Sequence, residues 1–530
     1  MAARIEMLGS ALLFVTALMV VIRVTLSFFQ KKPAPLPPGP KGLPILGNVL
    51  DLPLRGEREC DHWLKHKDIY GPISSITALG QTIVILHSPE LAVELLEKRS
   101  LKYGTRPPLA FAESVGWTQS LPIMPYNDTY RARRKLMHTM MGTKAIVAPY
   151  LALQTAEVHR FLFRVLRQPE SLVNHIKTEA AAIILKIVYG YTVDPHKPDP
   201  LVELVDEAME QFSAAVVPGA WLVDVMPVLK YIPDWLPGGR WKRTSREWHA
   251  VLKETSEKPL QFAQQRMARG NKDKNFVTKF YEGKEDIVTG WDNDNIKWSA
   301  LTTYGGGADT TVNAISSFFL AMTLFPEVQL KAREEIDRVV GTDRLPSFND
   351  RENLPYIEAV LKEAWRWHTV APISGPHTTT VEDFVNGYRI PKGAIVLPNV
   401  WWFTHDPAIY PDPMIFNPSR YLGSNPEPNP TGHIFGYGRR ICAGRYIADS
   451  TVWLTIARSL AVFEIGKGLD ESGREIEPIV NPLPGIISRP DEFQTTIKPR
   501  SHQHEALIRQ VEELHPWEES DAAELQKIVI

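Results

Sequence analysis

The arrangement of hydrophobic and polar residues changes along this chain and gives three patterns: an apolar run, a short alternating stretch and a long helical stretch. Residues 7–29 are almost wholly apolar, broken by Arg23 and a few small polar residues, and a helix of that length spans roughly 34 Å, enough to cross a bilayer. Residues 72–79 and 81–87 alternate around Gly80, which predicts a β-hairpin. A capped helix start follows at Ser88-Pro89, and the pattern is mostly helical from there to about residue 370. The sequence therefore predicts a mainly α fold with small β-sheets (α+β), preceded by an N-terminal transmembrane helix.

The residues that flank the apolar stretch predict its orientation. Lys31 and Lys32 follow it, whereas Arg4 and Glu6 cancel before it, so the positive-inside rule places the bulk of the chain in the cytoplasm. A cleaved signal peptide is the alternative, but the stretch has no clear cleavage site. Six prolines within residues 33–44 predict a stiff hinge. We divide the chain into an anchor (1–32), a hinge (33–44), one large domain (45–500) and a charged, helical tail (501–530).

Composition narrows the class of protein. The 530 residues are 44% hydrophobic and 23% charged, as in globular proteins. A net charge of −2 gives no general attraction to nucleic acid. Two cysteines exclude a disulfide framework and fit a reducing compartment. The 43 prolines are spread along the whole chain, which argues against a repeat array.

The candidate chemistry centres on residues 435–445, Phe-Gly-Tyr-Gly-Arg-Arg-Ile-Cys-Ala-Gly-Arg. Cys442 has no second sulfur nearby, which excludes a local zinc site and a Cys-x-x-Cys pair. The arginines around it favour a thiolate, and the glycines leave room for a large flat group. The pattern Phe435-x-x-Gly438-x-Arg440-x-Cys442-x-Gly444 resembles the haem-binding loop of the cytochrome P450 family. A structural cysteine in a glycine-rich turn is the alternative.

The resemblance implies the cytochrome P450 fold and haem b (iron protoporphyrin IX), with Cys442 as the axial ligand of the iron. In the family, a Trp-x-x-x-Arg motif contacts a haem propionate. Here Tyr130 replaces the tryptophan and Arg134 keeps the cation. His377 occupies the place of another propionate-binding basic residue, although a lone histidine is more often structural. Asp128 is the predicted cap of the basic helix that carries Arg134.

Residues 295–324 read as one long helix that contains three consecutive glycines, Gly305 to Gly307. Each should cost about 1 kcal/mol against alanine, so a ligand that approaches the helix closely would explain them. A notch for helix packing is the alternative. The run Gly306-Gly307-x-Asp309-Thr310-Thr311 resembles the oxygen-activation signature of the family. The resemblance implies that Thr310 supports proton transfer to bound O2 and that Asp309 gates protons from solvent.

Glu363-x-x-Arg366 places two opposite charges on one helix face. A surface salt bridge is the common meaning of such a pair. Together with Arg420 in Phe-Asn-Pro-Ser-Arg-Tyr, however, the pair resembles the buried Glu–Arg–Arg triad that locks the haem loop in the family.

The resemblance also implies partners. No flavin or nicotinamide domain pattern follows Cys442, so electrons would come from NADPH through a separate NADPH-cytochrome P450 reductase, with cytochrome b5 as a second donor. Basic residues would dock the reductase: Arg131, Arg133, Lys135, Arg439 and Arg445. The Trp- and Pro-rich residues 212–241 resemble a loop between two lid helices that dips into the membrane surface.

We therefore expect a haem-thiolate monooxygenase of the endoplasmic reticulum membrane, single-pass, that oxidises a hydrophobic small molecule in fungal secondary metabolism or xenobiotic oxidation. No nucleic acid partner is expected. By analogy, an apolar pocket would be lined by Phe111, Trp117, Phe212, Val370, Ile373 and Ile486. A haem-thiolate isomerase or dehydratase that needs no O2 is one alternative, and a non-catalytic haem sensor is another.

Overall fold

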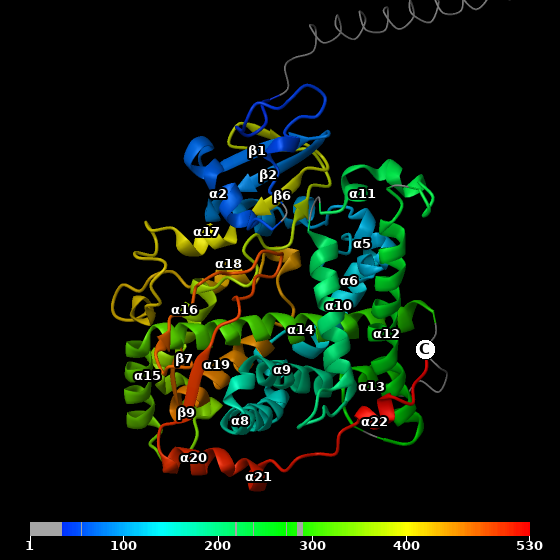
Figure 1. Ribbon diagram of the computed structural model, residues 1–530. Coiled ribbons are helices and arrows are strands. Elements are labelled where there is room, and N and C mark those ends of the chain that lie inside the picture. Colours follow the sequence, from blue (N-terminus) through cyan, green and yellow to red (C-terminus); the bar gives the residue numbers. More distant parts are fainter. Residues whose placement is uncertain (1–33, 55, 218–219, 237, 272, 283–289) are drawn as a thin grey trace, which may run out of the picture.

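The computed structural model describes residues 34–54, 56–217, 220–236, 238–271, 273–282 and 290–530 (Figure 1). Helices dominate, and the few strands form small sheets, so the expected mainly α class is confirmed. The predicted anchor over residues 1–32 lies outside the described residues. Among the described helices, none alone has the length and hydropathy to span a bilayer. Only α14 (Trp291–Leu324) and α15 (Pro326–Val339) pass that test as a pair, and they are bent by 104° at the break between them.

The main sheet lies at one end of the molecule, at the top of Figure 1. Its strands follow the order β1-β2-β6-β3: β1 (Ile73–Ala78), β2 (Gln81–Leu86), β6 (Ile395–Pro398) and β3 (His377–Thr378). The predicted hairpin is confirmed, because β1 and β2 pair antiparallel. Its turn has φ 48° at Leu79 and 84° at Gly80, the backbone that a two-residue hairpin of type I′ requires.

The described part of the proline-rich segment lies against this sheet. The Pro38 carbonyl accepts from the Ser75 backbone N–H at 2.8 Å, and the Pro37 carbonyl accepts from the Ser75 hydroxyl at 2.6 Å. The Pro35 carbonyl accepts from the Arg389 N–H at 2.8 Å. Proline carbonyls remain free to accept because a polyproline chain has no internal hydrogen bonds. The segment is therefore held by hydrogen bonds to strand β1 and to the strand that contains Arg389, at the sheet end of the domain.

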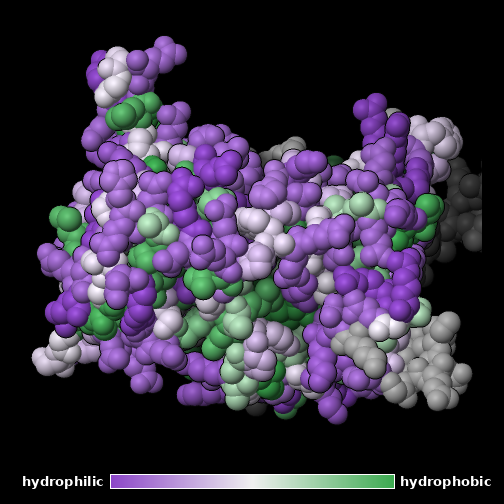
Figure 2. Space-filling model, turned by 90° about the horizontal axis from the view of Figure 1, so that it is seen from below, coloured by the Kyte–Doolittle hydropathy of each residue, from purple (hydrophilic) through white to green (hydrophobic). Residues whose placement is uncertain are grey.

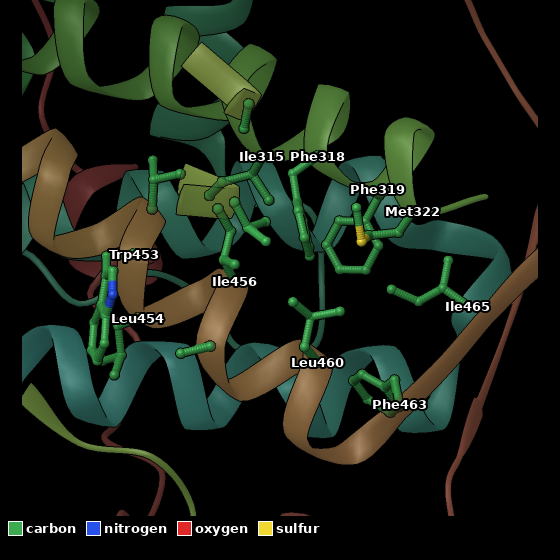
Figure 3. Close-up of a cluster of buried hydrophobic side chains, with 14 of the residues drawn as sticks. Ile315, Phe318, Phe319, Met322, Trp453, Leu454, Ile456, Leu460, Phe463 and Ile465 are labelled. Carbon is green, nitrogen blue, oxygen red and sulfur yellow. The ribbon is translucent and has the colours of Figure 1, made fainter. Parts of the chain in front are cut away.

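The helical body is built around α14, which crosses the middle of the molecule (Figure 1). Around it pack α8 (Leu151–Arg167), α9 (Leu172–Tyr189), α16 (Pro355–Trp367) and α19 (Arg445–Val462). Figure 3 shows the centre of this core, where Phe318, Phe319 and Met322 of α14 face Ile456 and Leu460 of α19. Strand β7 (Phe463–Leu469) closes the cluster with Phe463 and Ile465. The long central helix is thus held by apolar contacts along its C-terminal half.

A second layer of helices covers the N-terminal half of α14. It consists of α5 (Ala110–Val115), α6 (Asp128–Met141), α10 (Pro200–Val216), α11 (Leu222–Val225) and α12 (Trp241–Ala268). The predicted cap of α6 was wrong by one residue. Asn127, which has an extended backbone, accepts from the Tyr130 N–H, and Asp128 is the first helical residue.

Shorter elements complete the chain, and the tail packs on the body. The tail forms α20 (His502–Arg509), α21 (Val511–Leu514) and α22 (Ala522–Leu525). The remaining helices are α2 (Glu59–Tyr70), α3 (Pro89–Ala92), α4 (Ser100–Tyr103), α7 (Lys144–Val147), α13 (Phe276–Tyr281), α17 (Val400–His405) and α18 (Thr431–Ile434). The remaining strands are β4 (Asp383–Val385), β5 (Tyr388–Ile390), β8 (Glu475–Ile476) and β9 (Thr495–Pro499).

Candidate active site

A cavity of about 380 Å³ lies between α14 and the loop that carries Cys442. This volume is within the usual range for ligand pockets, roughly 300–1,000 Å³. One wall is formed by residues 434–436 and 440–444, and the opposite wall by residues 305–307 and 310–311 of α14. The Cys442 motif and the glycine–threonine motif of α14, about 130 residues apart in the chain, thus face each other across one space.

Backbone hydrogen bonds fix the position of Cys442 in its loop. Its N–H donates to the Phe435 carbonyl at 2.7 Å, while Gly436 and Gly438 have φ 77° and 48°. The sulfur is open to the cavity although protein encloses it on the other sides. Burial raises the pKa of the Cys442 thiol, and backbone N–H groups of Gly444 and Arg445 act against this effect. A cation at the sulfur would complete the stabilisation of the thiolate.

Three guanidinium groups line the same cavity: those of Arg106, Arg134 and Arg440. Arg440 donates to the carbonyls of Gly104 at 2.6 Å and Met124 at 2.7 Å. For Arg134, no acceptor lies within hydrogen-bond distance among the residues that the structure describes. Arg134 therefore presents a free cation to whatever fills the space.

Arg106 was missed by the sequence analysis. It donates to the carbonyls of Pro122, Gly375 and Pro376, each at 2.7 Å. Burial lowers the pKa of its guanidinium to about 9, so the group stays charged at neutral pH. Its sequence context, Thr-Arg-Pro-Pro, lies in a loop without periodicity, and no local pattern marks it as a cavity residue.

His377 lies on β3 beside this group and is buried. Its Nδ1 bonds to the Tyr103 carbonyl at 2.8 Å. It is not among the residues that line the described cavity, whereas its neighbour Arg106 is. Burial, with the nearby Arg106 charge, holds the pKa of His377 well below its ordinary value, so the imidazole is neutral at pH 7.

Tyr130 anchors the loop that carries Cys442. Its hydroxyl donates to the Arg439 carbonyl at 2.8 Å, and its ring lies 4.0 Å from the Arg440 guanidinium carbon. One turn earlier, the Tyr126 hydroxyl accepts from Arg439 at 3.0 Å. The hydroxyl of Tyr130 is therefore used inside the protein, which leaves the cation of Arg134 as the polar group that α6 offers to the cavity.

The three glycines of α14 have different surroundings. A Cβ on Gly305 would meet the Met209 sulfur at 2.9 Å, and a Cβ on Gly307 would meet Ile184 at 2.9 Å. A Cβ on Gly306 would meet no atom within 4 Å. Two of the glycines thus permit close packing of α10 and α9, as the packing alternative predicts, and only Gly306 leaves open space at the cavity wall.

Thr310 and Asp309 lie on different sides of α14. Thr310 lines the cavity, and its hydroxyl donates to the Gly306 carbonyl at 2.7 Å. Asp309 is not among the lining residues, and its carboxylate lies 3.5 Å from the Asn313 amide. Burial raises the pKa of Asp309. The pair therefore connects the cavity with the neighbouring face of the helix.

Glu363 lies between two guanidinium groups in the interior. Arg366 donates to both of its oxygens at 2.8 Å, and Arg420 donates to one at 3.1 Å. The Asn417 N–H adds a fourth bond at 2.8 Å. All three charged side chains are at most 2% exposed. Since a buried carboxylate is tolerated only when it is fully bonded, this cluster ties α16 to the segment before the Cys442 loop.

Four of the six predicted pocket residues line the cavity: Trp117, Phe212, Val370 and Ile486. The other two predictions were wrong. The Phe111 ring stacks on Trp221 at 3.5 Å, where it is buried away from the cavity. Ile373 lines a separate small cavity of about 20 Å³ next to α2.

The predicted reductase-docking set also needs one correction. Arg133 is 2% exposed, and its guanidinium bonds to Asn295 at 2.9 Å and to the Gln119 carbonyl. The Arg133 side chain faces the interior of the protein rather than solvent. Arg131, Lys135 and Arg439 reach the surface, although Arg131 is paired with Asp128.

The residues present fit a haem. The Cys442 thiol faces the cavity, the opposite helix wall is open at Gly306, and Arg134, which has no acceptor among the described residues, offers the cation that an anionic propionate needs. Cys442 would ligate the iron, and Arg134 with Arg106 and Arg440 would neutralise the carboxylates.

Comparison with known proteins agrees with a haem site at this cavity. The family model for cytochrome P450 matches residues 37–497. Cytochrome P450 monooxygenase CLM2 of Gibberella zeae is 45% identical over 98% of this chain and 99% of its own length. Multifunctional cytochrome P450 monooxygenase af510 of Aspergillus fumigatus is 45% identical over 90% of both chains. O-methylsterigmatocystin oxidoreductase of Aspergillus flavus is 38% identical over 93% of both.

The chain is a haem-dependent oxidoreductase by fold and site. It belongs to the cytochrome P450 family, and its relatives identify it as a monooxygenase.

Proposed function

We propose that this protein is a monooxygenase of fungal secondary metabolism that is anchored in the endoplasmic reticulum membrane, binds haem b and draws electrons from NADPH through a separate reductase. The observation that carries the proposal is the cavity itself, with Cys442 on one wall and the open position at Gly306 beside Thr310 on the other. When bound, the haem iron activates O2 and transfers one oxygen atom to the substrate.

The protein supplies position and protons. Cys442 would ligate the iron, and Arg134 with Arg106 and Arg440 would neutralise the haem carboxylates. The Thr310 hydroxyl, which now donates to the Gly306 carbonyl, can turn toward the cavity and donate there. Its own proton is then replaced from the side of Asp309.

Asp309 suits a proton relay because its pKa is raised by burial. A carboxyl with a raised pKa keeps its proton closer to neutral pH and can pass it on. Behind it lies a charged pair, Lys177 and Asp206 at 2.6 Å, on α9 and α10. The charges of this pair act on Asp309, and we place the entry of protons on this side of the helix, through Asp309 to Thr310.

The substrate we propose is a largely apolar, polycyclic small molecule. Trp117 and Phe212 form a T-shaped pair at 4.9 Å on one side of the cavity, and aliphatic side chains from α10, Val370 and Ile486 continue the wall. Flat aromatic surfaces pack well against such groups. The relative named O-methylsterigmatocystin oxidoreductase, which shares 38% identity, supports the same class.

The first test is the reduced carbon-monoxide difference spectrum of the wild type and of Cys442→Ser. A strongly red-shifted Soret band that disappears in the variant is the expected result. Haem binding without that shift in the wild type would overturn the assignment of the thiolate.

Oxygen consumption with reductase and NADPH separates the alternatives. A monooxygenase consumes both in the presence of a converted substrate, whereas an isomerase, a dehydratase or a haem sensor does not. The family match and the monooxygenase names of the relatives favour the first outcome. Thr310→Ala should lower product formed per NADPH while leaving the carbon-monoxide spectrum unchanged.

A further inference from the structure

The tail, residues 501–530, is bound to the body of the molecule along its length. In Figure 1 it runs along the lower side as α20 and α21 and then turns up to α22. Figure 2 shows this lower side as a mostly hydrophilic face with a hydrophobic area near its middle. Ile508 and Val511 are fully buried against the main core. His159 of α8 bonds to the Leu507 carbonyl at 3.0 Å, and Arg160 donates to the Pro516 carbonyl at 2.6 Å.

Beyond Pro516 the tail crosses to the helices that cover the cavity. Lys186 at the end of α9 pairs with Glu518 at 2.6 Å. Asp521 then exchanges two backbone-directed bonds with Thr192: its N–H donates to the Thr192 carbonyl at 3.0 Å, and its carboxylate accepts from the Thr192 N–H at 2.8 Å.

The same carboxylate of Asp521 accepts from Arg266 of α12 at 2.9 Å. The Asp521 side chain is 15% exposed, so this bond is screened less than a surface pair. Next to it, Arg269, the residue that follows α12, pairs with Glu524. Asp521 thus joins the segment between α9 and α10 to the C-terminal end of α12.

Helix α12 is divided into two parts at Pro259. Before it, Leu252 belongs to an apolar cluster shared with α5 and with the C-terminal half of α10. After it, Leu260 and Phe262 belong to a different cluster, which also contains Leu525 and Ile528 of the tail. The boundary between the two clusters on this helix falls within seven residues of sequence that include the proline.

The proline also breaks the hydrogen-bond ladder at the cavity. A proline within a helix has no N–H for the carbonyl four residues earlier and costs about 3 kcal/mol. That earlier residue is Thr255, which lines the cavity. A weak point in α12 therefore coincides with its contact to the substrate space.

We propose that the tail holds in place the helix α12, which covers the cavity and contributes Thr255 to its lining; we call the tail in this role a strap. Through Asp521 it fixes the part of α12 after Pro259, so that only residues 241–258 move when substrate enters, with Pro259 as the hinge. Asp521 is accordingly a positioning residue for the fixed end of α12, against which residues 241–258, with Thr255 at the cavity, move. The proposal rests on the function proposed above only in taking this cavity as the substrate site.

Hydrogen–deuterium exchange of the full-length holoenzyme tests the strap without turnover. In Asp521→Ala, the amides of residues 260–268 should exchange about 5- to 30-fold faster, the factor expected when one good hydrogen-bonded ion pair is lost. Amides of α14 and α19 should keep their wild-type rates. Glu512→Ala is the matched control, because Glu512 is an exposed tail carboxylate. Uniform acceleration in all helices, or no change at residues 260–268, would overturn the proposal.

Binding of 4-phenylimidazole to the haem iron, followed by its spectral shift, tests the hinge. Pro259→Ala restores the missing N–H, so association and dissociation should both slow by about fivefold or more while the Kd changes little. Asp521→Ala should instead weaken binding, with an unchanged carbon-monoxide spectrum. Unaltered association kinetics in Pro259→Ala would refute the hinge. If the wild type lacks the red-shifted carbon-monoxide band, the haem-thiolate function is refuted. The hydrogen–deuterium exchange result for the tail remains valid in that case.

Discussion

At the scale of single residues, Tyr130 connects the basic helix α6 with the loop before Cys442. Its hydroxyl bonds to the Arg439 carbonyl, and its ring supports Arg440. Tyr130→Phe removes only the hydroxyl and should speed haem loss to apomyoglobin by about fivefold, because one buried hydrogen bond is worth roughly 1 kcal/mol.

Tyr126→Phe is the control for that experiment. It removes a bond to the Arg439 side chain and leaves the backbone anchor in place, so haem retention should stay near the wild-type rate. Equal haem loss in both variants would show that the loop is not held through the Arg439 carbonyl.

Glu179 of α9 should make the free energy of unfolding depend on pH. It is fully buried, accepts from Thr455 at 2.6 Å, and burial raises its pKa to about 8 from an ordinary 4.5. Between these two pH values the native protein keeps a proton that the unfolded chain has released, so the free energy of unfolding falls as pH rises, by at most about 1.4 kcal/mol per pH unit.

Glu179→Gln removes this titration. Urea unfolding at pH 5, 6, 7 and 8 should therefore show a shallower loss of stability for the variant than for the wild type. Glu170→Gln, at an exposed site on the surface, serves as the control. Parallel pH profiles for wild type and Glu179→Gln would contradict the assignment.

At the scale of elements, the three adjacent glycines of α14 serve two purposes: Gly305 and Gly307 allow close helix packing, and Gly306 leaves space in the cavity. Gly306→Ala adds a methyl group to open space and should raise the free energy of unfolding by about 0.5–1 kcal/mol, the helix-propensity gain. Gly307→Ala would press on Ile184 and should lower it by roughly 1–3 kcal/mol.

Thermal unfolding of the two variants, each purified with haem, measures this difference. Gly306→Ala should also weaken the binding of bulky ligands, since its methyl group occupies the cavity. Equal destabilisation by both substitutions would show that the wall at Gly306 is already filled.

Much of this element-scale picture could be predicted from the sequence. The hairpin around Gly80, the helix start at Ser88-Pro89 and the long helix α14 follow from periodicity and caps, which are local signals. The sequence could not show that Arg133 is buried and Arg134 is not, because both lie in one basic run and the difference depends on Asn295 of a distant helix.

The same limit applied to the site. Cys442 and Thr310 stood out by motif, and the structure places both at one cavity. Arg106 carries no motif and became visible only through the carbonyls of Gly375 and Pro376 that surround it. Phe111 and Ile373 have the right apolar character, but the choice among apolar residues depends on packing, which a pattern does not determine.

At the scale of the whole molecule, exposed apolar side chains gather at two places near the sheet end. Ile45 and Leu50 of the N-terminal segment are 97% and 82% exposed, and Tyr231 and Trp235 of the loop after α11 are 85% and 81% exposed. These residues fit a membrane surface, where tryptophan and tyrosine are favoured.

A protein that lacks residues 1–32 should therefore still bind anionic lipid vesicles in a flotation assay. Replacing Ile45 and Trp235 by serine should reduce the bound fraction, whereas the same change at Leu330 of α15, another exposed apolar residue on a different element, should not. Equal binding by all three proteins would remove these surfaces from the account of membrane attachment.

The contact between Gly305 and Met209 has a consequence for the lifetime of the enzyme. The missing side chain brings the Met209 thioether to the cavity wall, and thioethers are readily oxidised to polar sulfoxides. Among the described α10 residues that line the cavity, Met209 alone carries a thioether, so it is the α10 side chain that peroxide from an unproductive cycle would oxidise most readily. Conversion of Met209 to its sulfoxide would place a polar group in the cavity wall and would mark the molecules that have released peroxide.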